Sequence, residues 1–197
     1  MNALLRWTAA FLPVLIVGMV MGGKNAVRNG DFEKFSGNEP SNWETTNLGK
    51  MLTVVSPSSN AHGGSLAVKC EVKNSFGSPM AGMIIQKNIP LSGEDVQVSL
   101  YYLLSPVGKD VGFLAVDFEN DEGSTVGMCQ HYLTAAEPKY TLFKAVTKLP
   151  EKTTHCEMRL TLMPEEEGGK LHEGSSILLD DISLVSLSAQ IDTSTRH

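Results

Sequence analysis

Hydrophobic and polar residues alternate with a period of two along most of the chain that follows residue 24. The apolar positions fall into sets: Leu66, Val68, Cys70 and Val72; Val96, Val98, Leu100, Tyr102 and Leu104; Leu114, Val116 and Phe118; Phe143, Ala145, Thr147 and Leu149; Cys156, Met158, Leu160 and Leu162; Ile182 and Leu184. Because successive side chains of a strand point to opposite faces, each set predicts a strand with one buried face.

Turn-forming clusters separate these sets at intervals of roughly ten to fifteen residues. Examples are Phe76–Pro79, Leu91–Gly93 and Asn120–Gly123. After the first residues, no stretch keeps a helical period over three turns. The pattern predicts an all-β jelly-roll β-sandwich of about nine or ten antiparallel strands.

The first residues differ from the rest of the chain. Arg6 is followed by an almost wholly apolar run, Trp7–Met21. A membrane crossing needs about 20 residues, and this shorter run is typical of a signal peptide. Val20–Gly22 is an acceptable cleavage site, and an uncleaved anchor is the alternative.

These features predict three regions: a leader over residues 1–23, a sandwich over 24–187, and a frayed polar tail over 188–197. The expected location is secreted, periplasmic or on the cell surface.

Charge and cysteine content narrow the classes of partner. The 197 residues include 22 acidic and 16 scattered basic ones, for a net charge of -6. Without a basic stripe, we expect no nucleic-acid partner and no membrane contact beyond the leader. The three cysteines, Cys70, Cys129 and Cys156, contain no zinc-binding pair. Cys70 and Cys156 could form a disulfide, although buried free thiols are the simpler interpretation.

Two short motifs lie near the two ends of the predicted sandwich. Val27–Glu33 reads Val-Arg-Asn-Gly-Asp-Phe-Glu, which we predict to be the first strand, and it is followed by Pro40–Trp43. Ile177–Leu184 reads Ile-Leu-Leu-Asp-Asp-Ile-Ser-Leu, and His62–Val68 and Tyr140–Phe143 lie between. Together these segments resemble carbohydrate-binding modules of families 4, 9 and 22, which have a galactose-binding-domain-like jelly roll.

The resemblance covers about residues 26 to 187, and it implies a structural calcium ion beside the first and last strands. Glu33 and Asp180 match the family's carboxylate ligands, and Ser65 could add a main-chain oxygen, since calcium takes oxygen ligands. Asp180 and Ile182 are two residues apart on the predicted strand, so we expect the Asp180 side chain on the same, apolar face. His62 departs from the family, which often has an acidic residue there. The alternative is that both carboxylates bind backbone amides without a metal.

The resemblance also implies a sugar site in a groove on the concave sheet or in its loops. The candidates are an aromatic residue in a loop, Phe76, and three residues expected opposite the apolar sets of their strands, Tyr101, His131 and Arg159. These four line one groove only if their strands share a sheet. Aromatic residues make up only 7% of the chain, which is little for a strong polysaccharide binder.

We therefore predict an exported, non-catalytic carbohydrate-binding module that recognises a polysaccharide or oligosaccharide, with glycoside hydrolases as possible neighbours. One alternative is a structural or adhesion sandwich that has lost sugar binding. The other is a small jelly-roll glycoside hydrolase, which needs two carboxylates facing each other across a cleft. Acidic residues are available for that role, but most lie in turn-like stretches, and no nucleophile elbow or metal-ligand spacing accompanies them.

Overall fold

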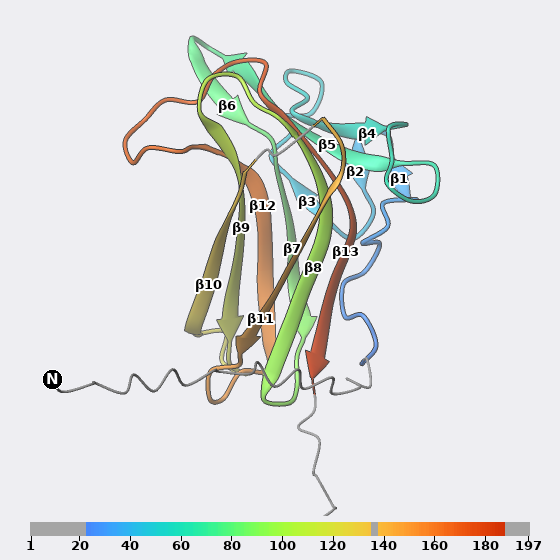
Figure 1. Cartoon of the computed structure of the whole chain (residues 1–197), viewed down its shortest axis with the longest axis vertical. Coiled ribbons are helices and arrows are strands. Elements are labelled where there is room, and N and C mark those ends of the chain that lie inside the picture. Colours follow the sequence, from blue (N-terminus) through green and yellow to red (C-terminus); the bar gives the residue numbers. More distant parts are fainter. Residues whose placement is uncertain (1–22, 135–137, 188–197) are drawn as a thin grey trace, which may run out of the picture.

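The computed structural model describes residues 23–134 and 138–187. The predicted cleavage site and the polar tail over 188–197 lie outside the described residues. Within the described residues the chain forms thirteen strands and no helix, in two main sheets whose neighbouring strands are antiparallel (Figure 1). The predicted all-β sandwich is confirmed.

Each main sheet has its own strand order. The five-stranded sheet runs β10 (Thr125–Leu133), β9 (Asp110–Glu119), β12 (His155–Pro164), β7 (Met83–Pro90) and β3 (Glu44–Thr45). The six-stranded sheet runs β11 (Thr141–Lys148), β8 (Asp95–Ser105), β13 (Ser176–Leu187), β5 (Ala67–Ser75) and β4 (Val55–Ser58), and β6 (Ser78–Ala81) pairs with β5. The two short strands β1 (Phe35–Ser36) and β2 (Glu39–Pro40) pair with each other.

The core lies between the two sheets, where the predicted apolar positions meet. Every second residue of β8 and of β12 is buried. The largest fully buried side chains include Phe32, Phe118, Leu100, Leu114, Met158, Leu160 and Leu179. Burial of such side chains stabilises the fold by roughly 1.5–3 kcal/mol each before conformational entropy is counted.

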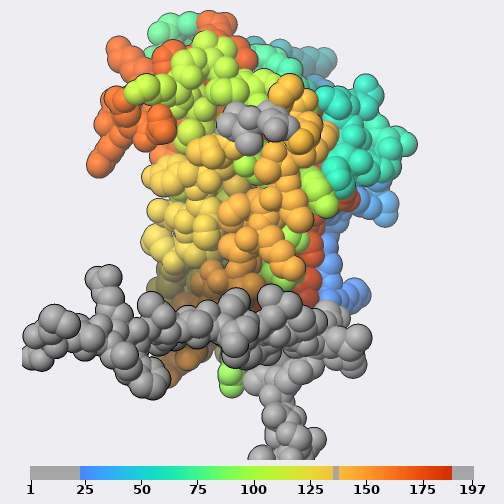
Figure 2. All heavy atoms as spheres, in the orientation of Figure 1, coloured from blue at the N-terminus to red at the C-terminus, as the bar shows by residue number. Residues whose placement is uncertain are grey.

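The strands β10 and β11 lie side by side along one edge of the sandwich (Figure 2). Each is the last strand of its own sheet. The ring of His131 on β10 contacts the ring of Phe143 on β11, with centroids 4.9 Å apart. The side chains of these two strands therefore close this edge of the core.

The opening motif is not a strand, which corrects the sequence prediction. Asn29 and Phe32 have positive φ angles of 51° and 48°, so the chain turns here. The buried amide of Gln86 on β7 accepts a hydrogen bond from the Arg28 backbone N–H and donates one to the Arg28 carbonyl, both at 2.8 Å. The Gln86 side chain thus forms the two hydrogen bonds with the Arg28 backbone that a neighbouring strand would otherwise form.

The opening and closing segments still lie together, as the resemblance implied. Ala26 donates its backbone N–H to the Leu184 carbonyl at 2.9 Å, and Ile182 donates to the Gly30 carbonyl at 2.8 Å. A Cβ atom on Gly30 would lie 2.2 Å from the Ile182 oxygen, so only glycine allows this approach. Trp43 is 6% exposed and packs against Phe32.

Three further observations concern the sequence predictions. The strand count exceeds the expected nine or ten because β1, β2 and β3 have two residues each. The thiols of Cys70, Cys129 and Cys156 are all free. Among the residues that the structure describes, no helix is long and apolar enough to cross a membrane.

Candidate functional site

The four predicted sugar-binding residues do not meet in one groove. Arg159 lies on β12 of the five-stranded sheet, and Tyr101 lies on β8 of the six-stranded sheet. His131 lies on β10 opposite the buried Leu114, so its side chain faces between the sheets rather than outward. Phe76 lies at the tip of the β5–β6 hairpin. The condition that their strands share a sheet is not met.

Tyr101 is engaged by a neighbouring loop. The ring of His62 stacks on it with centroids 3.4 Å apart and an interplanar angle of 13°. Nδ1 of His62 lies 2.7 Å from Oδ2 of Asp181, and Tyr140 meets the same imidazole edge-on at 5.6 Å. Burial raises the pKa of the Tyr140 hydroxyl, which donates a hydrogen bond to the Asn60 carbonyl. The rings of His62, Tyr101 and Tyr140 pack against one another, so the face of Tyr101 that His62 covers is not accessible to a sugar.

Phe76 has the opposite environment. Its side chain is 88% exposed and its φ is +51°, in the left-handed region. Phe76 and Gly77 form a two-residue hairpin loop in which both φ angles are positive. The exposed ring is available to a partner. It lies at the tip of the hairpin formed by β5 and β6, and β6 pairs with β5 outside the main strand order of the sheet.

The predicted calcium ligands anchor a loop through backbone amides. Oε1 of Glu33 accepts N–H bonds from Ser65 at 2.8 Å and Leu66 at 3.0 Å, which lower the pKa of this carboxyl. The fully buried Asp180 accepts N–H bonds from His62 at 2.8 Å, Gly63 at 3.1 Å and Asp181 at 2.8 Å. Burial raises the Asp180 pKa, and these amides oppose the rise.

Asp180 does not share a face with Ile182, contrary to the sequence prediction. The register of β13 against β8 shifts between Asp180 and Ser183, and Asp181 has a φ of +49°. A bulge adds one residue and so reverses the alternation beyond it. Asp180 is therefore buried under the loop that contains His62 instead of in the core.

Glu33 and Asp180, which the resemblance assigns to calcium, both accept hydrogen bonds from backbone N–H groups of this loop. The loop presents Ser65 to Glu33 through its N–H, whereas calcium would need an oxygen from it. No group of three or more His, Cys, Asp or Glu side chains among the described residues could hold a metal ion. Calcium at this position stays a prediction.

The outward side chains of the five-stranded sheet form a second candidate surface, which we call the outer platform. Its members come from β10 (Met128, Gln130, Tyr132), β9 (Phe113, Ala115, Asp117, Glu119), β12 (His155, Glu157, Arg159, Thr161), β7 (Ile85, Lys87) and β3 (Glu44). They alternate with the buried side chains of the same strands, so they point away from the core.

Aromatic side chains occupy one end of the outer platform. Phe113 on β9 lies opposite Tyr132 on β10, with ring centroids 5.6 Å apart. Tyr132 is 60% exposed, and Met128 on the same strand is 61% exposed. A tilted pair of rings, with Tyr132 exposed and Phe113 half-buried, provides the apolar contact area that sugar C–H surfaces need, with a polar group at one end.

Polar side chains occupy the next two rows. Gln130, Ala115 and Arg159 lie side by side across β10, β9 and β12, two residues from the aromatic pair and so about 7 Å away along the strands. In the following row Asp117 lies opposite Glu157. Arg159 forms a short ion pair with Asp117, and its Nε lies 3.4 Å from Oε1 of Glu157.

The sequence analysis identified Arg159 but missed its neighbours Phe113 and Tyr132. A signal for them was present, because Phe113 alternates with the buried Leu114, and Tyr132 alternates with the buried Leu133. What the sequence could not show is that β9 pairs with both β10 and β12. That pairing brings the aromatic and charged side chains together.

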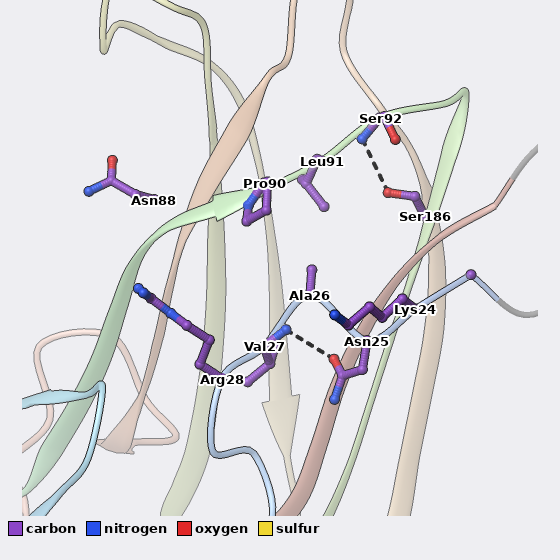
Figure 3. Close-up of a pocket in the computed structure, with 11 residues that line it drawn as sticks. Lys24, Asn25, Ala26, Val27, Arg28, Asn88, Pro90, Leu91, Ser92 and Ser186 are labelled. Atoms are coloured by element: carbon purple, nitrogen blue, oxygen red, sulfur yellow. Dashed lines mark hydrogen bonds between the residues drawn. The ribbon is translucent and has the colours of Figure 1, made fainter.

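A cavity of about 810 Å³ lies elsewhere, where the opening segment passes β7 and β13 (Figure 3). Residues 23–28 form one wall, and Asn88, Pro90, Leu91, Ser92 and Ser186 form the other. Within the second wall, the Ser92 N–H donates a hydrogen bond of 3.2 Å to Ser186 Oγ. None of its lining residues is aromatic and none is a predicted site residue, so it lacks the stacking surface of the outer platform.

Comparisons with known proteins support the fold. Neither a family model nor a curated protein matches this chain. Two similar solved structures are carbohydrate-binding modules. One is TmCBM61 in complex with β-1,4-galactotriose, with a TM-score of 0.55, 18% identity, and coverage of 82% of this chain and 97% of that one. The other is the CBM22-1 xylan-binding domain of Paenibacillus barcinonensis Xyn10C, with a TM-score of 0.51, 12% identity, and coverage of 85% and 97%.

A third similar structure is the enzymatically active domain of tailspike protein 4 from bacteriophage CBA120. Its TM-score is 0.61 with 16% identity, and the match covers 83% of this chain but 21% of that one. This chain thus spans about a fifth of the tailspike domain's length. The shared architecture is a β-sandwich, a fold that these similar structures show both in binding modules and within a larger enzymatic domain.

Proposed function

We propose that this protein is a non-catalytic carbohydrate-binding module that binds a polysaccharide or oligosaccharide on its outer platform. The observation that carries the proposal is the row of Phe113 and Tyr132 beside the row of Gln130 and Arg159. The rings supply a stacking surface, and the polar side chains next to them supply donors and acceptors for hydroxyl groups. The fold shared with carbohydrate-binding modules agrees with this proposal.

The outer platform also contains paired carboxylates, which invites a comparison with glycosidases. Asp117 and Glu157 lie on neighbouring strands, but both contact the guanidinium of Arg159. A glycosidase places its two carboxyl groups on either side of the scissile bond, with the substrate between them. Here an arginine occupies that place, so binding is a better explanation of the arrangement than catalysis.

A structural or adhesion role is the second candidate, and one observation favours it. Leu142 and Val146 on the edge strand β11 are 51% and 57% exposed. Exposed apolar side chains on an edge strand suit contact with another protein. This alternative predicts that the domain binds no glycan.

The first experiment measures binding of residues 24–197 to a panel of plant, algal and microbial polysaccharides. For a glycan that binds, Tyr132→Ala and Phe113→Ala should each weaken binding by about tenfold or more, which corresponds to 1.4 kcal/mol. Phe76→Ala is the matched control, because it removes an exposed ring at a hairpin that is not part of the outer platform.

Each outcome separates the candidates. If Phe76→Ala weakens binding and Tyr132→Ala does not, the site lies at the hairpin and the outer platform is not the binding surface. If no glycan binds, the adhesion role becomes the better explanation. Export by a cleaved leader is part of the proposal, and N-terminal sequencing of the protein expressed in full would test it.

A further inference from the structure

The permanent cations of the outer platform are already paired with carboxylates. Nζ of Lys87 lies 2.8 Å from Oε2 of Glu44, and this contact raises the pKa of the lysine. The guanidinium of Arg159 contacts both Asp117 and Glu157. An incoming carboxylate or sulfate would therefore meet no unpaired lysine or arginine among the described residues of this surface.

The acidic side chains of the outer platform outnumber those cations. Glu119 is the fourth carboxylate and pairs with His155, with Oε2 and Nε2 3.0 Å apart. Lys87 and Arg159 oppose these four carboxylates, so the surface is negative even when His155 is protonated. Oδ1 of Asp117 is buried and accepts no hydrogen bond from the described residues.

Charge on a sugar ring would change its interaction with this surface. Two charges interact more strongly at a protein surface than in bulk water, because the effective dielectric constant there is lower. A uronic acid would be repelled by the excess carboxylates, whereas an ammonium group would be attracted. The rings of Tyr132 and Phe113 act in the same direction, because aromatic faces attract cations.

We infer that the outer platform selects sugars with a free ammonium group and rejects uronic acids. The inference rests on the proposed function and narrows its ligand to a chemical class, the amino sugars. Selection follows from the excess of carboxylates and from the absence of an unpaired lysine or arginine among the described residues of this surface. It requires no change in the fold.

The test compares three oligosaccharides of equal length: a glucosamine oligomer, its N-acetylated counterpart and an oligogalacturonate. Measurements at about pH 6 keep the amine protonated and the uronate ionised. We expect the glucosamine oligomer to bind at least about tenfold more tightly than the oligogalacturonate, a difference of 1.4 kcal/mol. Raising the salt concentration from 50 to 500 mM should reduce this difference in affinity, because salt screens exposed charges.

Variants provide a second readout. Glu157→Gln should reduce the preference for the glucosamine oligomer, whereas Glu94→Gln, an exposed position in the turn between β7 and β8, should leave it unchanged. The salt dependence of the unmodified protein tests the inference even if Glu157→Gln fails to fold.

The outcomes also separate this inference from the proposed function. Equal or tighter binding of the oligogalacturonate would overturn the charge selection and leave carbohydrate binding in place. Binding of the N-acetylated oligomer alone would overturn it too. If none of the three oligomers and no polysaccharide of the panel binds, the proposed function itself is wrong.

Discussion

Phe76 adopts a backbone conformation that is unfavourable for its residue type. A non-glycine residue in the left-handed region costs about 1–2 kcal/mol, and asparagine tolerates it best. The exposed ring of Phe76 makes little contact that could offset this cost.

Phe76→Asn should therefore raise the free energy of unfolding by about 1 kcal/mol, because Asn-Gly is the preferred two-residue hairpin loop. The midpoint of urea denaturation measures this change. Phe76→Ala is the control, since it removes the ring but keeps the strained backbone, and it should change stability little. A loss of stability in Phe76→Asn would show that the ring makes a stabilising contact.

Asp180 illustrates how a buried carboxylate can be satisfied without a metal. It accepts three backbone N–H groups, and leaving such a donor unpaired costs about 1–3 kcal/mol. Asp180→Ala should thus lower the melting temperature with or without calcium. That variant alone cannot test the predicted ion.

Chelation of the unmodified protein does test the calcium prediction. An ion that binds only the folded state at 100 times its Kd stabilises it by about 2.7 kcal/mol. If calcium is bound, a chelator should lower the melting temperature and added calcium should restore it. Glu33→Gln should reduce this response, because it removes one predicted ligand. An unchanged melting temperature would show that Glu33 and Asp180 serve only as acceptors for the loop amides.

At the scale of elements, the opening segment depends on close contact with β13. Gly30→Ala would place a Cβ atom 2.2 Å from the Ile182 carbonyl oxygen and push the two backbones apart. We expect a loss of about 1–3 kcal/mol, the usual cost of overpacking, in a denaturant titration.

Gly49→Ala is the comparison for this prediction. Gly49 has a φ of +58° with nothing within 4 Å of a Cβ atom, so its substitution reports only backbone strain, about 1–2 kcal/mol. If Gly30→Ala is harmless, the opening segment does not need its contact with Ile182.

The sequence predicted those strands in which alternation is regular, and it failed where polar side chains are part of the fold. The strands β8 and β12 bury every second residue and were predicted from that pattern. The strand β7 buries the polar Gln86 together with Ile84 and Ile89, which hides its alternation. The sequence predicts a strand for the opening motif because its link to Gln86 is a tertiary contact that local patterning does not encode.

At the scale of the whole molecule, the candidate site depends on strand order. Alternation shows that Tyr101 and Arg159 point away from the apolar residues of their strands, but not that those strands lie in different sheets. His131 faces the core although the sequence predicts it outward, because Met128 and Tyr132 of the same strand are apolar or aromatic and yet lie on the outward face. Predicting the outer platform would have required, beside the β9–β10 hairpin, the pairing β9–β12, which joins segments well separated in sequence.

The sandwich as a whole determines the chemistry of its cysteines. Cys70 lies on the six-stranded sheet and Cys156 on the five-stranded one, both fully buried, and burial raises the pKa of the Cys70 thiol to about 12. Burial also raises the pKa values of Cys129 and Cys156. Because the thiolate is the reactive form, all three thiols should react slowly with an alkylating reagent at about pH 8 while the protein is folded.

Denaturation without reductant should then expose three reactive thiols per chain, as counted by mass spectrometry. Cys70→Ala should lower the count to two and serves as the control for complete labelling. Labelling of a single thiol would show that two of them form a disulfide. Such a disulfide would contradict the free thiols of the structure and the placement of the two cysteines that form it.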